Sequence, residues 1–230
     1  QVRFDKITPV AGLMFKAGEH LRLYASAGRG FETPTFNELA YRVDGGAGLA
    51  FDLLPAVSRN VELGLKWRNA GGARFETALF RADTDDELAV ARNLGGRSSF
   101  RNAGRARRQG LETSLETALS DRWHLQLAHA WLEATFRDDL LVCRGAGCTT
   151  PTTLVAAGSR IPGVARQQVF ARAQWRDGAW SAALEAEGVG AVVVNDVASE
   201  SAPGYCLLHL ETAREWRLPS GTLRAFARVD

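Results

Sequence analysis

Apolar and polar residues alternate along most of this chain. In "HLRLYAS" (20–26), Leu21 and Leu23 fall on one face, and Arg22 and Tyr24 fall on the other. Because successive side chains of a strand point to opposite faces, this alternation predicts antiparallel strands with one apolar face. The periodicity predicts about ten strands. Five further stretches show it clearly: 60–68, 122–131, 166–175, 180–188 and 206–216.

The connections between the predicted strands fall into a short class and a long class, and the two classes alternate. The short ones are rich in Gly, Asn and Asp, as hairpin turns are. Short turns at one edge and long, usually functional, loops at the other are typical of an outer-membrane β-barrel. The short turns are 17–20, 69–73, 119–122, 176–179 and 218–221, and the long loops are about 28–57, 88–100, 138–160 and 190–203.

Five of the six tryptophans lie within a few residues of a short turn, on the apolar side of their strands. An indole ring suits the membrane–water interface, because there it is half-buried while its N–H group stays wet. The tryptophans therefore predict an aromatic girdle at one membrane boundary. They favour a barrel over a soluble β-sandwich, which could also show alternation. The predicted girdle consists of Trp67, Trp123, Trp175, Trp180 and Trp216.

The face opposite the apolar side chains carries many charged groups, such as Arg22, Lys66 and Glu185. These charges would be very costly in a soluble core. They suit the wet lumen of a barrel, or contact with a polar domain inside it. The solvated face of a soluble, single-layered sheet remains an alternative.

Composition and motifs narrow the function further. The net charge of +2 gives no reason to expect a nucleic acid as a partner. No apolar run reaches the roughly 18 residues of a transmembrane helix. The four histidines are scattered over strands without a catalytic nucleophile beside them. We therefore expect no enzyme, no metal site and no cofactor.

The cysteines indicate the redox environment. Cys143 and Cys148 lie in the short polar stretch "CRGAGC", which predicts a local disulfide and an oxidising compartment. A metal site there is disfavoured, because no histidine or further cysteine lies nearby to complete a tetrahedral ligand set. Cys206 is expected to be a small apolar strand residue.

Several motifs resemble those of one family. The stretch "YASAGRGFETPTFNEL" (24–39) is similar to the strand and external loop of TonB-dependent outer-membrane receptors, with a Gly-Phe-x-x-Pro core. The stretches "IPGVARQQVFARAQW" (161–175) and "APGYCLLHLE" (202–211) resemble later strands of that family, in the same order. The family's Asn-Ala-Gly…Gly-x-Glu strand is matched by Asn102, Ala103, Gly104, Gly110 and Glu112.

The resemblance implies an all-β, antiparallel transmembrane β-barrel segment that is incomplete and therefore open. The family's barrel has twenty-two strands and follows a plug domain and a segment that contacts TonB. The sequence 1–230 lacks motifs for the plug and for the final strand or strands. We therefore expect residues 1–230 to form part of a receptor barrel in the outer membrane of a Gram-negative cell.

A run of arginines lies where the 88–100 loop leads into the next strand. The membrane-embedded part of that strand is predicted to begin near Leu111. Strand parity then points Arg108 inward, and Arg101, Arg105 and Arg107 outward toward lipopolysaccharide phosphates, which the arginine fork can bind. The alternative is a solvated rim. The expected ligand-binding residues come from this arginine run and from the first long loop. They are Arg29, Phe31, Glu32, Arg97 and Arg108.

The resemblance implies active uptake of a metal chelate, with a ferric siderophore as the expected ligand. The expected partners are this chelate, the TonB complex acting through the plug, and the lipid and lipopolysaccharide of the outer membrane. A passive porin and a soluble β-rich binding module are the alternatives. An upstream plug would exclude the porin, and solubility without detergent would favour the soluble module.

Overall fold

The structure, a computed structural model, describes residues 3–144, 148 and 150–230. Ten long antiparallel strands form one sheet, and their order in the sheet follows their order along the chain. Sequence periodicity predicted both the number and the antiparallel arrangement of these strands. They are β1 (Val10–Lys16), β2 (Leu21–Glu32), β3 (Ala56–Arg68), β4 (Arg74–Asp85), β7 (Ala106–Ala118), β8 (Trp123–Phe136), β11 (Gln167–Asp177), β12 (Trp180–Val189), β15 (Tyr205–Leu218) and β16 (Gly221–Val229).

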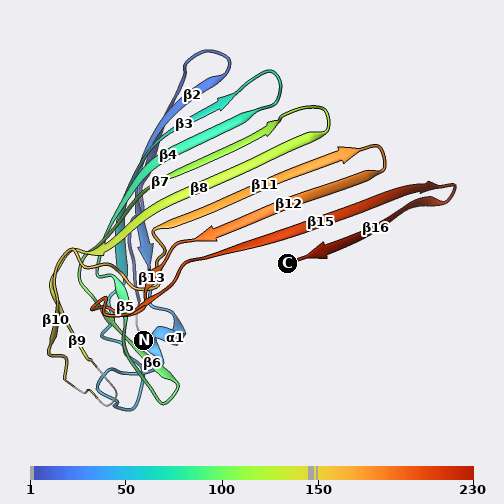
Figure 1. Ribbon diagram of the computed structural model, residues 1–230. Helices are drawn as coiled ribbons and strands as arrows, with labels where there is room; N and C mark the ends of the chain where they lie inside the picture. Colours follow the sequence, from blue (N-terminus) through green and yellow to red (C-terminus); the bar gives the residue numbers. More distant parts are fainter. Residues whose placement is uncertain (1–2, 145–147, 149) are drawn as a thin grey trace.

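The sheet is curved but not closed. Figure 1 shows the short hairpin turns at one end of it, and the long connections gathered at the other end. Strands β1 and β16 are the edges, since each pairs with one neighbour in the described part of the chain. This arrangement is the incomplete barrel that the sequence predicted.

Cross-strand register gives the sheet two chemically different faces. Residues directly opposite each other on paired strands point to the same side. One row joins Leu63, Leu79, Leu111 and Trp131 across β3, β4, β7 and β8. Its side chains are apolar, and Leu63 and Leu79 are 61% and 58% exposed. We call this side the apolar face.

The other side, the polar face, carries ion pairs that run from strand to strand. Lys66 on β3 contacts Glu76 on β4 at 3.1 Å, and Arg172 on β11 contacts Glu185 on β12 at 2.7 Å. Tyr24 on β2 reaches over the neighbouring strand β3, where its hydroxyl donates a hydrogen bond of 2.5 Å to Glu62. The ring can lie there because the residue directly opposite Tyr24 on β3 is Gly64, where any β-carbon would collide with the ring.

The five girdle tryptophans lie at the hairpin end of the sheet, on the apolar face. Trp175 pairs directly with Trp123 across β11 and β8, and Trp67 lies opposite Phe75 at the start of β4. Trp123 and Trp180 are 46% and 47% exposed, so neither is packed into an interior. Their contact with a membrane boundary stays a prediction.

The long connections contain small elements that alternation alone did not predict. Residues 88–100 were expected to be a loop, yet they form most of a hairpin that turns at Gly95 and Gly96, both with positive φ. Adjacent glycines suit such a tight turn because they adopt positive φ without steric cost. The small elements are α1 (Phe36–Leu39), β5 (Leu88–Leu94), β6 (Arg97–Asn102), β9 (Leu140–Val142), β10 (Thr153–Val155), β13 (Val192–Val193) and β14 (Ser201–Ala202).

These elements pack on one another to form a loop cluster with its own core. Phe136, 1% exposed, packs with Leu140, Val142 and Val155. The first long loop joins the cluster through Asn102, whose side chain accepts a hydrogen bond from the Leu54 N–H and donates one to the Leu54 carbonyl. The long loops are therefore an ordered layer over one end of the sheet.

A disulfide links Cys143 and Cys148, with their Cα atoms 5.5 Å apart. It lies just after β9, at the edge of the loop cluster. Three residues between the two cysteines, 145–147, lie outside the described residues. No helix in the described part of the chain is long and apolar enough to cross a membrane.

The two faces predict opposite responses to a new charge. In the full-length protein, Leu79→Arg places a cation in the middle of the apolar face, where the lipid contact predicted from the sequence would make it cost roughly 2–4 kcal/mol. We expect much less folded protein in outer-membrane fractions, measured by immunoblotting. The matched control Ser114→Arg adds the same charge to the polar face of β7. Equal losses from both variants would contradict the assignment of the faces.

Candidate functional site

Two adjoining hollows lie where the polar face meets the loop cluster, and both are lined by Glu87 and Arg108. The larger, about 800 Å³, is bounded by β5, by residues around Ile161 and by residues 194–200. The smaller, about 340 Å³, lies against the ends of β2, β3 and β4. Together they form an opening between the polar face of the sheet and the loop cluster.

A bidentate ion pair joins the two hollows. The Arg108 guanidinium donates to the two carboxylate oxygens of Glu87 at 2.6 and 3.0 Å. Glu87 is 13% exposed and Arg108 is 35% exposed, measured over their side chains. Arg108 is therefore a neutralised cation, and its removal would leave Glu87 largely buried without its partner.

Three of the five predicted ligand residues come together at the smaller hollow. Phe31 and Glu32 at the end of β2 line it with Arg108. Arg29 does not line it, and lies opposite Arg59 on the apolar-face side of the sheet. Arg97 lies at the start of β6, where its guanidinium stacks over the Tyr41 ring at 5.2 Å. The ligand roles of all five remain predictions.

Sequence reasoning missed two arginines of the larger hollow, Arg92 and Arg144. Neither forms an ion pair among the described residues. Arg144 lies in the stretch that we considered only for its cysteines, and Arg92 lies in the segment expected to be a loop. Placing Arg92 at the hollow requires the register of the β5–β6 hairpin, in which Arg92 lies opposite Ser99, and the sequence does not reveal this register.

The three arginines predicted to contact lipopolysaccharide have different surroundings. Arg107 contacts Asp83 at 2.6 Å on the apolar-face side of β7, and Arg105 contacts Asp138 at 2.6 Å beside it. The Arg105 guanidinium lowers the pKa of the Asp138 carboxyl. Arg101 lies inside the loop cluster instead. Their contacts with lipid remain predictions.

Arg101 is held in the loop cluster with incomplete pairing. One of its N–H groups donates to the Leu141 carbonyl at 2.5 Å, and another nitrogen lies 3.6 Å from an Asp196 oxygen. Two of its buried nitrogens have no hydrogen-bond partner among the described residues. Burial raises the pKa of the Asp196 carboxyl, and Arg101 partly offsets this effect.

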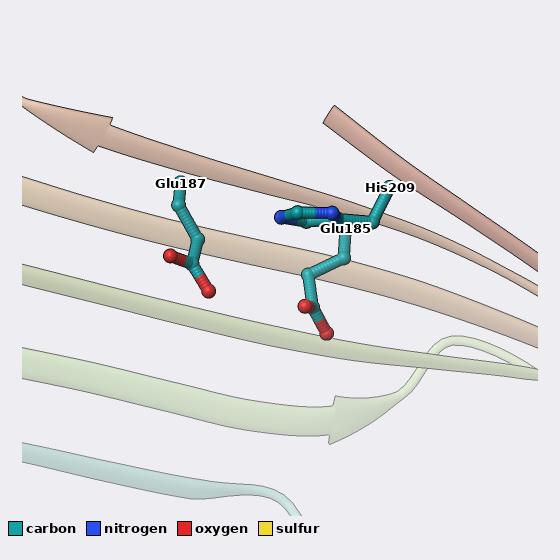
Figure 2. A group of neighbouring side chains, drawn as sticks. All are labelled: Glu185, Glu187 and His209. Atoms are coloured by element: carbon teal, nitrogen blue, oxygen red, sulfur yellow. The ribbon is translucent and has the colours of Figure 1, made fainter. Parts of the chain in front are cut away.

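Among the residues that the structure describes, one group could hold a metal ion, on the polar face of β12 and β15. Figure 2 shows Glu185, Glu187 and His209, whose possible ligand atoms lie within 4.8 Å of one another. A histidine with carboxylates is a chemically suitable donor set for a divalent transition metal. Arg172 already pairs with Glu185 at 2.7 Å, however, and His209 lies 2.7 Å from Asp230.

The family of this chain follows from its whole length. The sequence model described as "TonB dependent receptor-like, beta-barrel" matches residues 1–230. The chain belongs to the TonB-dependent receptor β-barrel family. Members of this family are outer-membrane transport receptors rather than enzymes.

Named relatives of this TonB-dependent receptor chain are distant. The probable TonB-dependent siderophore receptor PiuA of Acinetobacter baumannii is 23% identical over 175 residues, covering 71% of this chain and 21% of PiuA. The solved structure of PiuA from that organism superposes with a TM-score of 0.67 at 17% identity, over 89% of this chain and 29% of that chain. The copper transporter OprC superposes with a TM-score of 0.68 at 17% identity, over 90% of this chain and 31% of that chain.

At these identities, the structural likeness shows the fold alone. The chain spans about a fifth of the curated relative and under a third of the two solved structures. Both the activity of the full-length protein and the identity of its substrate are therefore proposals.

The Glu87–Arg108 pair predicts a specific pattern of stabilities. Arg108→Ala should destabilise the receptor by about 1–3 kcal/mol, because Glu87 is left buried without a partner. The double variant Glu87→Gln/Arg108→Ala should recover part of this loss. Thermal unfolding of the detergent-solubilised receptor measures both. Additive losses in the double variant would show that the two residues are not coupled.

Proposed function

We propose that this chain forms part of the barrel wall of an outer-membrane receptor that takes up an anionic metal chelate of the ferric-siderophore class. TonB supplies the energy through a plug domain in the complete receptor. The apolar face contacts membrane lipid, and the polar face lines the passage that the plug occupies. The long loops, with the two hollows, form the external mouth.

The names of the relatives support a metal-chelate substrate. PiuA is described as a siderophore receptor, and structural neighbours include receptors for ferric enterobactin and ferric preacinetobactin. OprC is described as a copper transporter, so the fold serves more than one metal. We choose a ferric chelate because the sequence relative is a siderophore receptor.

The observation that carries the proposal is the larger hollow in the loop cluster. Its volume, about 800 Å³, is in the range of small-molecule sites. Arg92 and Arg144 line it without an ion-pair partner among the described residues, and one carboxylate, Glu200, does the same, which leaves one cation in excess. Because a guanidinium pairs well with carboxylate and catecholate oxygens, these arginines suit an anionic chelate. The chelate already saturates its metal, so the wall needs no metal ligand of its own.

A TonB requirement separates active transport from a passive porin. We expect uptake of radiolabelled ferric siderophore to depend on the receptor gene and to stop in a strain that lacks TonB. Complementation with the receptor gene is the positive control. Receptor-dependent uptake that continues without TonB would favour the porin.

The two arginines of the larger hollow, Arg92 and Arg144, predict an electrostatic contribution to siderophore binding. Arg92→Gln/Arg144→Gln should weaken binding of the siderophore by about tenfold at low salt, because two charge-assisted contacts are lost. The affinity of this variant should also depend less on ionic strength than that of the wild type. Fluorescence quenching against salt concentration measures both effects.

The control for that experiment is Arg42→Ala, which removes an exposed loop arginine already paired with Asp44 at 2.6 Å. Siderophore affinity should stay unchanged in this variant. If Arg42→Ala and the Arg92/Arg144 variant have equal effects, the larger hollow is not the binding site. If binding is insensitive to salt in every variant, the anionic-chelate assignment fails.

A further inference from the structure

A second pair of hollows lies on the opposite side of the same strands, on the apolar face. The hollow nearer the loop cluster, about 380 Å³, is polar and is lined by Arg59, Arg105, Arg107 and Arg137. The one next to it, about 310 Å³, is apolar and is lined by Leu63, Leu79 and Trp131 among others. Both extend over strands β3, β4 and β7; the apolar hollow also reaches Trp131 on β8, and the polar one reaches Arg137, directly after β8.

Register places the two hollows in one continuous track. The row Arg59, Asp83 and Arg107 lies four residues along the strands from the row Leu63, Leu79 and Leu111. At about 3.3 Å per residue, the two rows are separated by roughly 13 Å. The arginine-rich surface therefore lies next to an exposed apolar surface. A single amphipathic molecule is long enough to contact both.

The basic surface has more cations than its carboxylates can neutralise. Asp83 is shared by Arg107 at 2.6 Å and Arg81 at 2.7 Å. Arg59 pairs with Asp85, and Arg105 pairs with Asp138. Arg29 and Arg137 form no ion pair among the described residues. The six arginines of this surface are Arg29, Arg59, Arg81, Arg105, Arg107 and Arg137, and three aspartates face them.

One cross-strand pair in this surface brings two cations together, and Asp85 neutralises only one of them. Arg29 on β2 lies directly opposite Arg59 on β3. Like charges directly opposite each other destabilise a sheet. An anion that bridges the two guanidinium groups would reverse the sign of this interaction, and phosphate oxygens match the arginine fork bidentately.

We propose that this surface, with the apolar hollow beside it, binds a phosphorylated, multi-acyl glycolipid of the outer leaflet. The arginines hold the phosphates, and an acyl chain occupies the hollow beside Trp131. The proposal depends on the outer-membrane placement in the proposed function but not on which chelate is transported. It keeps Arg105 and Arg107 in the role predicted from the sequence and replaces Arg101 with residues that the register revealed. It also moves Arg29 from the predicted chelate site to this surface.

The extent of the surface favours a glycolipid over a diacyl phospholipid. Arg29 and Arg107 are separated by three strand spacings, from β2 through β3 and β4 to β7. At about 4.8 Å per spacing, this is roughly 14 Å. A single phosphodiester reaches only part of that width, whereas a sugar backbone with phosphates at two positions can contact both ends.

The test uses the complete receptor, purified in mild detergent from native outer membranes. Glycolipid retained per receptor is measured by mass spectrometry, and its affinity is measured by titration. We expect Arg29→Gln/Arg137→Gln to reduce glycolipid affinity by more than about tenfold, since each basic residue near a lipid surface contributes roughly fivefold. Neither substitution leaves an aspartate unpaired. Trp131→Leu should weaken binding through the acyl chain alone.

The matched control is Arg214→Gln, on the apolar face of β15 near the opposite end of the sheet. Its glycolipid affinity should equal that of the wild type. The proposal is overturned if wild-type receptor retains no glycolipid, if all variants bind it equally, or if an anionic diacyl phospholipid binds as tightly. Siderophore binding by each variant is measured in parallel, so that misfolding, or a failure of the transport proposal, is recognised separately.

Discussion

The ladder of backbone hydrogen bonds between neighbouring strands is the constraint on which the rest of this structure depends. A strand that crosses lipid must satisfy its N–H and C=O groups through other strands, because lipid offers no partners. In the continuous sheet of ten strands, the eight inner strands meet this requirement on both sides, while β1 and β16 each pair on one side in the described part of the chain. The register of each pair fixes which side chains share a face. The apolar face, the polar face and both pairs of hollows follow from that register.

The architecture was predictable because a period of two is a local property of the sequence. The alternation around Leu63 or Leu125 identifies a strand and its apolar side without any knowledge of its neighbours. The loop hairpins were less visible. Strands β9, β10, β13 and β14 have two or three residues each, too few to show a period. Residues of β9 and β10 are buried in the core around Phe136.

The candidate sites were only partly predictable, because they combine residues from different strands. The alternation along β7 predicted that Arg108 and Arg107 lie on opposite faces of the sheet, and the register confirms it. It could not reveal that Glu87 neutralises Arg108, or that Arg29 lies opposite Arg59. Arg101 was assigned to the outer rim because its segment was expected to continue the strand. A hairpin instead turns that segment into the loop cluster.

The most direct test of this account follows lipid exposure along one strand. Spin labels at 125, 126, 127 and 128 on β8 of the complete receptor in bilayers would report collisions with dissolved oxygen, which concentrates in lipid. The account predicts alternation: high oxygen accessibility at Leu125 and Leu127, and low accessibility at Gln126 and Ala128. Equal accessibility at all four positions, or alternation in the opposite phase, would contradict it.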